Sequence, residues 1–130
     1  MHVFASSGRV DTDFTAKLTD VYPDGRSILI CDGIRRARYR NGVETAELMA
    51  PGQVYEIPID LGSTAIVFDA GHTVRVAVSS SNAPRFSPNP NTGGDLSVDD
   101  DAGAVAATNT IYMEEEYPSR VVLPVRGEGT

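Results

Sequence analysis

The residues best suited to chemistry in this chain are two histidines, one cysteine and two aspartates that stand one residue apart. Acyl transfer by a serine hydrolase requires a serine held on a sharp turn, a histidine that takes its proton and a carboxylate that orients the histidine. The sequence contains no Gly-x-Ser-x-Gly string, His2 stands at the start of the chain, and His72 stands in a predicted turn. We therefore expect both histidines to be solvated and this chain to carry no catalytic residue.

The single cysteine, Cys31, ends the apolar run Ile28-Leu29-Ile30-Cys31. No neighbouring group would clearly lower its pKa, and a small thiol in an apolar run is typical of a core residue. We expect Cys31 to be buried and unreactive. One cysteine also excludes a disulfide within the chain.

Asp11 and Asp13 invite two interpretations. A carboxylate pair can perform acid–base catalysis, but two carboxylates just ahead of a strand are commonly acceptors for backbone N–H groups or partners for arginine. We favour the second interpretation and expect Asp11 or Asp13 to lie near Arg36, Arg38 or Arg85.

A second group of aspartates offers hard oxygen ligands of the kind that calcium takes: Asp95, Asp99, Asp100 and Asp101. Their spacing matches no EF-hand, so a solvated acidic loop is the favoured interpretation and a calcium site is the alternative. One cysteine and two distant histidines disfavour zinc. We expect no metal and no cofactor.

The charge balance of the 130-residue chain is acidic, with a formal net charge of −7. Phosphate binding needs a net basic surface, so we expect no nucleic-acid partner. Four closely spaced arginines are a local exception: Arg35, Arg36, Arg38 and Arg40. A solvated or salt-bridged face is the favoured interpretation for them, and contact with a neighbouring domain is the alternative. The sequence shows neither a membrane-length apolar stretch nor a signal-peptide pattern, so we expect no membrane contact and a cytoplasmic location.

Alternating apolar and polar residues predict an all-β chain that forms one domain over residues 1–130. The predicted strands are Val3–Ala5, Phe14–Thr19, Arg26–Cys31, Tyr55–Leu61, Ala65–Phe68, Val74–Val78, Ile111–Met113 and Arg120–Val125.

The segment Tyr22-Pro23-Asp24-Gly25 predicts a tight turn, and Pro58 predicts an edge strand or a bulge. The unbroken apolar run Ala65–Phe68 predicts a strand covered on both faces, Ile34–Arg40 an irregular segment and 93–107 a flexible loop. Strands with short turns indicate a β-sandwich, which periodicity alone does not sort into immunoglobulin-like or jelly-roll forms.

The loop Ser79–Gly93 is unusually specified, because it contains three prolines and three asparagines directly after a predicted strand. Each proline fixes φ and removes a backbone donor, and asparagine side chains can bond their own backbone in turns. We expect a rigid loop that lies against another surface.

Several ordered strings resemble the C-terminal domain of X-Pro dipeptidyl-peptidases and cocaine-esterase-type acyl hydrolases. These strings are Ser-Ser-Ser-Asn-x-Pro-Arg-Phe-x-x-Asn-Pro-Asn-Thr-Gly over 79–93, Asp-Thr-Asp-Phe-Thr-Ala-Lys-Leu over 11–18 with Val21-Tyr22-Pro23-Asp24-Gly25, Cys-Asp-Gly-Ile-Arg-Arg-Ala-Arg-Tyr-Arg over 31–40, and the closing passages at 109–112 and 118–125. The resemblance covers nearly the whole chain. It implies a galactose-binding-like jelly roll, and the point at which Met1 stands implies a roll that lacks its first one or two strands.

The resemblance also implies a non-catalytic role. In that family the serine, aspartate and histidine belong to a preceding α/β-hydrolase domain, and the C-terminal domain packs on it and helps to wall the substrate cleft. The loop Ser79–Gly93 and the segment Asp32–Tyr39 are then the candidates for the interdomain face. The residues singled out for that face are Arg36, Tyr39, Arg85, Phe86, Asn89 and Asn91.

A binding or self-assembly module with no attached hydrolase is the alternative function. A roll without its leading strands would expose a sheet edge or an apolar groove, and exposed edges invite pairing with another chain. Under this alternative we expect a homo-oligomer.

Overall fold

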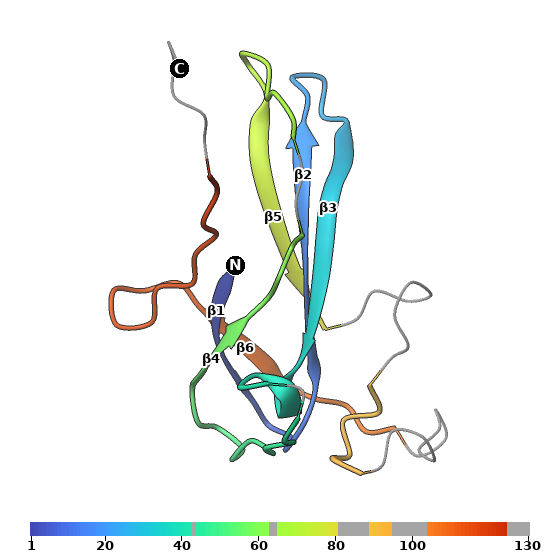
Figure 1. The fold of residues 1–130 in the computed structure, drawn as a ribbon, viewed down its shortest axis with the longest axis vertical. Helices are drawn as coiled ribbons and strands as arrows, with labels where there is room; N and C mark the ends of the chain where they lie inside the picture. The colour runs from blue at the N-terminus through green and yellow to red at the C-terminus, as the bar shows by residue number, and fades with distance from the viewer. Residues whose placement is uncertain (43, 63–64, 81–88, 95–103, 125–130) are drawn as a thin grey trace.

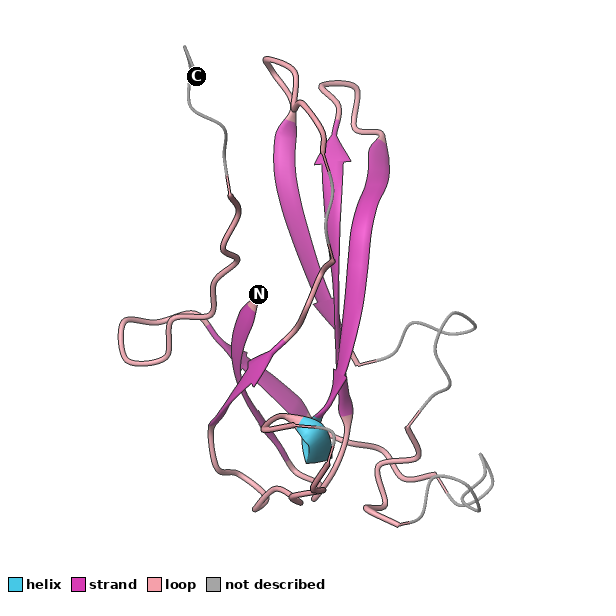
Figure 2. Cartoon of the chain, viewed as in Figure 1, coloured by secondary structure: helices cyan, strands magenta, loops and turns pink. Residues whose placement is uncertain are grey.

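Two antiparallel sheets of three strands each form the sandwich in the computed structural model (Figure 1, Figure 2). The smaller sheet has the order β4-β1-β6, from β4 (Tyr55–Pro58), β1 (His2–Ser7) and β6 (Asn109–Tyr112). The larger sheet has the order β3-β2-β5, from β3 (Ser27–Arg36), β2 (Asp13–Val21) and β5 (Thr73–Ser79). A 3₁₀ turn, η1 (Ala37–Tyr39), follows β3. The structure describes residues 1–42, 44–62, 65–80, 89–94 and 104–124.

The hairpin of β2 and β3 forms because its turn suits a reversal of the chain. The Gly25 N–H donates to the Tyr22 carbonyl over 2.9 Å, and Gly25 takes a φ of 94°, which a residue without Cβ adopts at little cost. The register of β2 on β3 shifts between Leu18 and Thr19, which marks a β-bulge. The predicted turn is therefore confirmed.

The hydrophobic core lies where the two sheets overlap. Alternate residues of the strands point inward, so Val3 and Ala5 of β1 meet Phe14 and Ala16 of β2. The rest of the core comes from Ala37, Met49, Ile57 and Ile59. The larger sheet extends well beyond this overlap (Figure 1).

Several predicted elements are confirmed. The predicted strands at Val3–Ala5, Phe14–Thr19, Val74–Val78 and Ile111–Met113 correspond to β1, β2, β5 and β6. Pro58 ends β4, which is an edge strand as predicted, because proline has no N–H to offer a further strand. The all-β sandwich class is confirmed.

Two predicted strands are wrong. Ala65–Phe68 forms no strand, and Val67 is 79% exposed, because no neighbouring strand pairs with this apolar run. Only Arg120 of the predicted strand Arg120–Val125 makes a β-bridge, with His2, and residues 121–124 are unpaired. Val125 lies outside the described residues.

Two further predictions need correction at β3. The segment predicted to be irregular is regular over Ile34–Arg36, which continues β3, and then forms η1. Cys31 is only half-buried, because the far end of β3 lies beyond the smaller sheet and leaves Leu29 exposed. Periodicity identified the apolar residues but not the extent of the opposite layer.

No helix in the described ranges is long and apolar enough to cross a membrane.

Gly33 is the point of closest approach between β3 and the chain that leaves β4. A Cβ at Gly33 would overlap the carbonyl oxygen of Asp60 and crowd the Ile59 side chain. Gly33→Ala should therefore lower the free energy of unfolding by about 1–3 kcal/mol, as measured by urea denaturation. Gly8→Ala is the matched control, because its Cβ would meet only the Thr108 carbonyl at 3.8 Å. Equal effects of the two substitutions would contradict this close packing.

Candidate interdomain site

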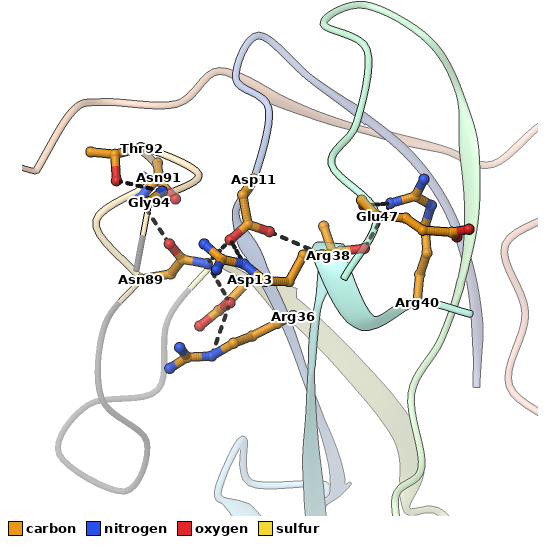
Figure 3. A network of polar contacts seen from close by, with 11 residues as sticks. Asp11, Asp13, Arg36, Arg38, Arg40, Glu47, Asn89, Asn91, Thr92 and Gly94 are labelled. Atoms are coloured by element: carbon orange, nitrogen blue, oxygen red, sulfur yellow. Dashed lines mark hydrogen bonds and ion pairs between the residues drawn. The ribbon is translucent and has the colours of Figure 1, made fainter. Parts of the chain in front are cut away.

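A buried pair of carboxylates stands at the start of β2. Asp11 and Asp13 are both fully buried, and arginines from the end of β3 and from η1 neutralise them. Asp11 accepts the Arg38 Nε–H over 2.8 Å and the Arg38 backbone N–H over 3.0 Å. Arg36 Nε lies 3.6 Å from Asp13 Oδ1. The predicted pairing of Asp11 and Asp13 with Arg36 and Arg38 is confirmed (Figure 3).

Asn89 joins the two carboxylates. Its side-chain amide nitrogen donates to Asp11 Oδ2 and to Asp13 Oδ1, each over 2.9 Å. Asn89 is 8% exposed, so both bonds lie in a region shielded from water. We call Asp11, Asp13, Arg36, Arg38 and Asn89 the carboxylate network.

The segment Asn89–Gly94, which ends the predicted docking loop, is held by its own turn chemistry. The Asn89 side-chain oxygen accepts the Asn91 backbone N–H over 2.8 Å, and Asn91 takes a positive φ of 65°, which asparagine tolerates better than most residues. The Asn91 amide donates to the Val105 carbonyl over 2.9 Å, and the Val105 N–H donates to the Pro90 carbonyl over 2.9 Å. The carboxylate network therefore anchors a turn that is itself well defined.

The arginines in η1 and directly after it are structural. Arg40 donates to the carbonyls of Ala37 and Glu47 over 2.9 and 2.5 Å, and its guanidinium lies 4.3 Å from the centre of the Tyr55 ring. Arg38 and Arg40 are both buried. Arg38 is paired with Asp11 and Arg40 with backbone carbonyls, so neither guanidinium is solvated. One Arg38 guanidinium nitrogen, Nη2, is buried without a hydrogen-bond partner in the described part of the chain.

Burial is the main cause of the shifted pKa in the carboxylate network. Desolvation raises the pKa of Asp13 above 3.8, although the Asn89 hydrogen bond and the Arg36 charge oppose that shift. Desolvation and the neighbouring Asp32 also raise the pKa of the Cys31 thiol. A raised pKa lowers the thiolate fraction, which supports the prediction that Cys31 is not a nucleophile.

The six residues singled out from the sequence have different positions. Arg36 belongs to the carboxylate network with about a quarter of its side chain exposed, and Tyr39 is half-buried in η1. Asn89 is directed inward and Asn91 is half-buried, so both shape the loop from within. Arg85 and Phe86, and the acidic residues Asp95, Asp99, Asp100 and Asp101, lie outside the described residues. A direct interdomain contact by any of the six stays a prediction.

The histidines differ from expectation. His72 is not solvated, because its Nδ1 lies 2.8 Å from Asp20 Oδ1, both side chains are nearly buried, and its ring stands 4.2 Å from that of Tyr22. His2 is about two-fifths exposed and pairs with Glu56 over 3.0 Å. Sequence reasoning missed the His72–Asp20 pair, because a separation of 52 residues in sequence leaves no local signal for it.

The described residues hold no serine bonded to either histidine and no group of three or more His, Cys, Asp or Glu side chains that could hold a metal ion. His72 and Asp20 supply two groups of a catalytic triad without its nucleophile.

The chain is similar to a known family of domains and to a curated relative. The family of X-Pro dipeptidyl-peptidase C-terminal non-catalytic domains matches residues 1–122. Cocaine esterase of Rhodococcus sp. (strain MB1 Bresler) is 48% identical over 123 residues, which are 95% of this chain and 21% of the relative.

Two solved structures resemble the fold. An aminopeptidase from the marine sediment archaeon Thaumarchaeota archaeon gives a TM-score of 0.84 at 30% identity, over 90% of this chain and 21% of that chain. An alpha-amino acid ester hydrolase gives a TM-score of 0.76 at 27% identity, over 89% of this chain and 20% of that chain. The chain thus spans about a fifth of the length of these relatives.

The raised pKa of Asp13 predicts a pH dependence of stability. Between the unfolded value near 3.8 and the higher folded value, the folded state binds more protons than the unfolded state, so this carboxyl favours folding increasingly as the pH falls. Asp13→Asn removes that titration. We expect the free energy of unfolding of the wild type, relative to Asp13→Asn, to rise from about pH 7 to about pH 4 in denaturant titrations. A difference that stays constant or falls would contradict the raised pKa.

Proposed function

Because the chain belongs to the family of X-Pro dipeptidyl-peptidase C-terminal non-catalytic domains, we propose that it packs on an α/β-hydrolase catalytic domain and helps to shape that domain's substrate cleft. The curated relative and the solved neighbours are esterases and peptidases of which this chain matches about a fifth, so the reacting groups are expected in the remaining four-fifths. The partner domain is proposed to act in cis.

The observation that carries this proposal is the assembly of both candidate segments at one end of the sandwich. The carboxylate network brings the end of β3 and η1 together with Asn89–Gly94, although Asn89 is 76 residues from Asp13 in sequence (Figure 3). Asn89–Gly94, the described end of one segment predicted for docking, is therefore linked through Asp11 and Asp13 to the other, at the end of β3 and η1.

This end of the domain is suited to positioning rather than to reaction. Its charges are buried and paired, so its backbone is held in one arrangement, whereas a reacting group would have to reach substrate. A rigid wall contributes by orienting bound substrate and excluding water, which affects rate without supplying any group that reacts. Arg36 and Tyr39 keep partly exposed side chains there and are the proposed contacts.

A chimera tests the proposal. The matching C-terminal part of the Rhodococcus cocaine esterase is replaced by this chain, and ester hydrolysis is measured beside a version that lacks this part. We expect the chimera to restore hydrolysis that the truncated enzyme lacks, and Tyr39→Ala in the chimera to lower kcat/KM about tenfold by loosening the cleft wall.

Leu29→Ala is the control within the chimera, because Leu29 is exposed at the far end of β3, the strand that leads into η1. It should leave kcat/KM unchanged. A folded chimera with no more activity than the truncated enzyme would overturn the proposal, as would equal effects of Tyr39→Ala and Leu29→Ala.

A further inference from the structure

A pocket of about 370 Å³ lies between the connection of β1 to β2 and the turn Asn89–Gly94. Its walls come from segments that are far apart in the sequence: residues 8–10, Pro51, residues 91–92 and Val105. None of the five residues of the carboxylate network lines it. The pocket is therefore a second feature of this region, separate from the buried charges.

Hydrogen bonds hold the walls of the pocket in place. The Val10 carbonyl accepts the Met49 N–H over 2.7 Å, which ties this wall to the segment that leads to Pro51. The Asn91 side-chain amide donates to the Val105 carbonyl over 2.9 Å, which ties two further walls together. Because the walls are already bonded, a ligand does not have to order them when it binds.

Arg9 is the only charged residue that the described part of the chain contributes to the pocket. Its side chain is exposed, and its Nε–H donates to the Ala106 carbonyl over 2.7 Å. Since Ala106 follows Val105, this bond holds the guanidinium beside the Val105 wall. Within the described residues, nothing is hydrogen-bonded to the two terminal nitrogens, Nη1 and Nη2. These nitrogens form one edge of the guanidinium, and their parallel N–H groups match the two oxygens of a carboxylate.

The other walls select among anions. The side chains of Val10, Pro51 and Val105 are aliphatic, and both valines are half-buried. One arginine balances one negative charge, and the formal net charge of −7 on the chain opposes a second. A carboxylate with an apolar body satisfies both conditions, whereas inorganic phosphate would leave the aliphatic walls uncovered.

We propose that this pocket binds a small monocarboxylate, with its two oxygens on Arg9 and its apolar body against Val10, Pro51 and Val105. A cavity of about 150 Å³ is enough to hold benzene, so the larger pocket has room for an acid of about five to ten carbon atoms. The proposal does not depend on a hydrolase partner.

Titration of the 130-residue chain with linear monocarboxylates, followed by NMR of the backbone amides, tests the proposal. The amides of Gly8, Val10 and Val105 should shift and saturate. Affinity should rise about threefold for each methylene group from acetate to hexanoate, because each one buries apolar area. Hexanol should bind at least about tenfold more weakly than hexanoate, because it cannot form a charge-assisted pair with Arg9.

Arg9→Gln should weaken hexanoate binding about tenfold or more, because it removes the charge and the fork. Arg75→Gln is the matched control: it changes the net charge by the same amount, and Arg75 is exposed on β5 outside the pocket. It should leave the affinity unchanged.

Equal effects of the two substitutions would overturn the proposal, as would the absence of saturable shifts. Affinity that does not depend on chain length would contradict the apolar walls. Inorganic phosphate or hexanol that binds as tightly as hexanoate would contradict the choice of a monocarboxylate.

Discussion

Two carboxylates buried side by side are the constraint on which the candidate site depends. Asp11 and Asp13 carry charge into a region without water, which costs several kcal/mol per ion unless partners compensate it. Arg36, Arg38 and Asn89 supply that compensation. Since these partners come from β3, η1 and a loop far along the chain, satisfying the two charges also fixes where all three segments lie.

Under the proposed function, this constraint is what would allow a domain with few features of a catalytic site to affect catalysis. Among the described residues no serine is hydrogen-bonded to either histidine, and the nearly buried pair His72–Asp20 lies at the opposite end of the larger sheet from the carboxylate network. The buried side chains of the carboxylate network hold the backbone of the surface above them in one arrangement. Such a surface can wall a cleft reproducibly, and the membership of the chain in a family of non-catalytic domains agrees with that role.

Local physics was enough to predict much of this structure. Period-two alternation identified β1, β2 and β5, and the missing N–H of Pro58 placed β4 at an edge. The pairing of Asp11 and Asp13 with arginine followed from the common role of carboxylates just ahead of a strand as acceptors for backbone N–H groups or partners for arginine. The failures concern neighbours that no local pattern specifies. Ala65–Phe68 is apolar but finds no partner strand, and the role of Asn89 depends on a contact across 78 residues.

The most direct test of the account is a double-mutant cycle between Asp11 and Asn89, with the free energy of unfolding measured for Asp11→Ala, Asn89→Ala and the double variant. If the carboxylate network pins the loop to β2, the coupling energy should be about 1.5 kcal/mol or more, as for other hydrogen bonds to a buried charge. The same cycle between Asp11 and the exposed Asn41 should be additive within about 0.5 kcal/mol. Additivity between Asp11 and Asn89 would contradict the central claim.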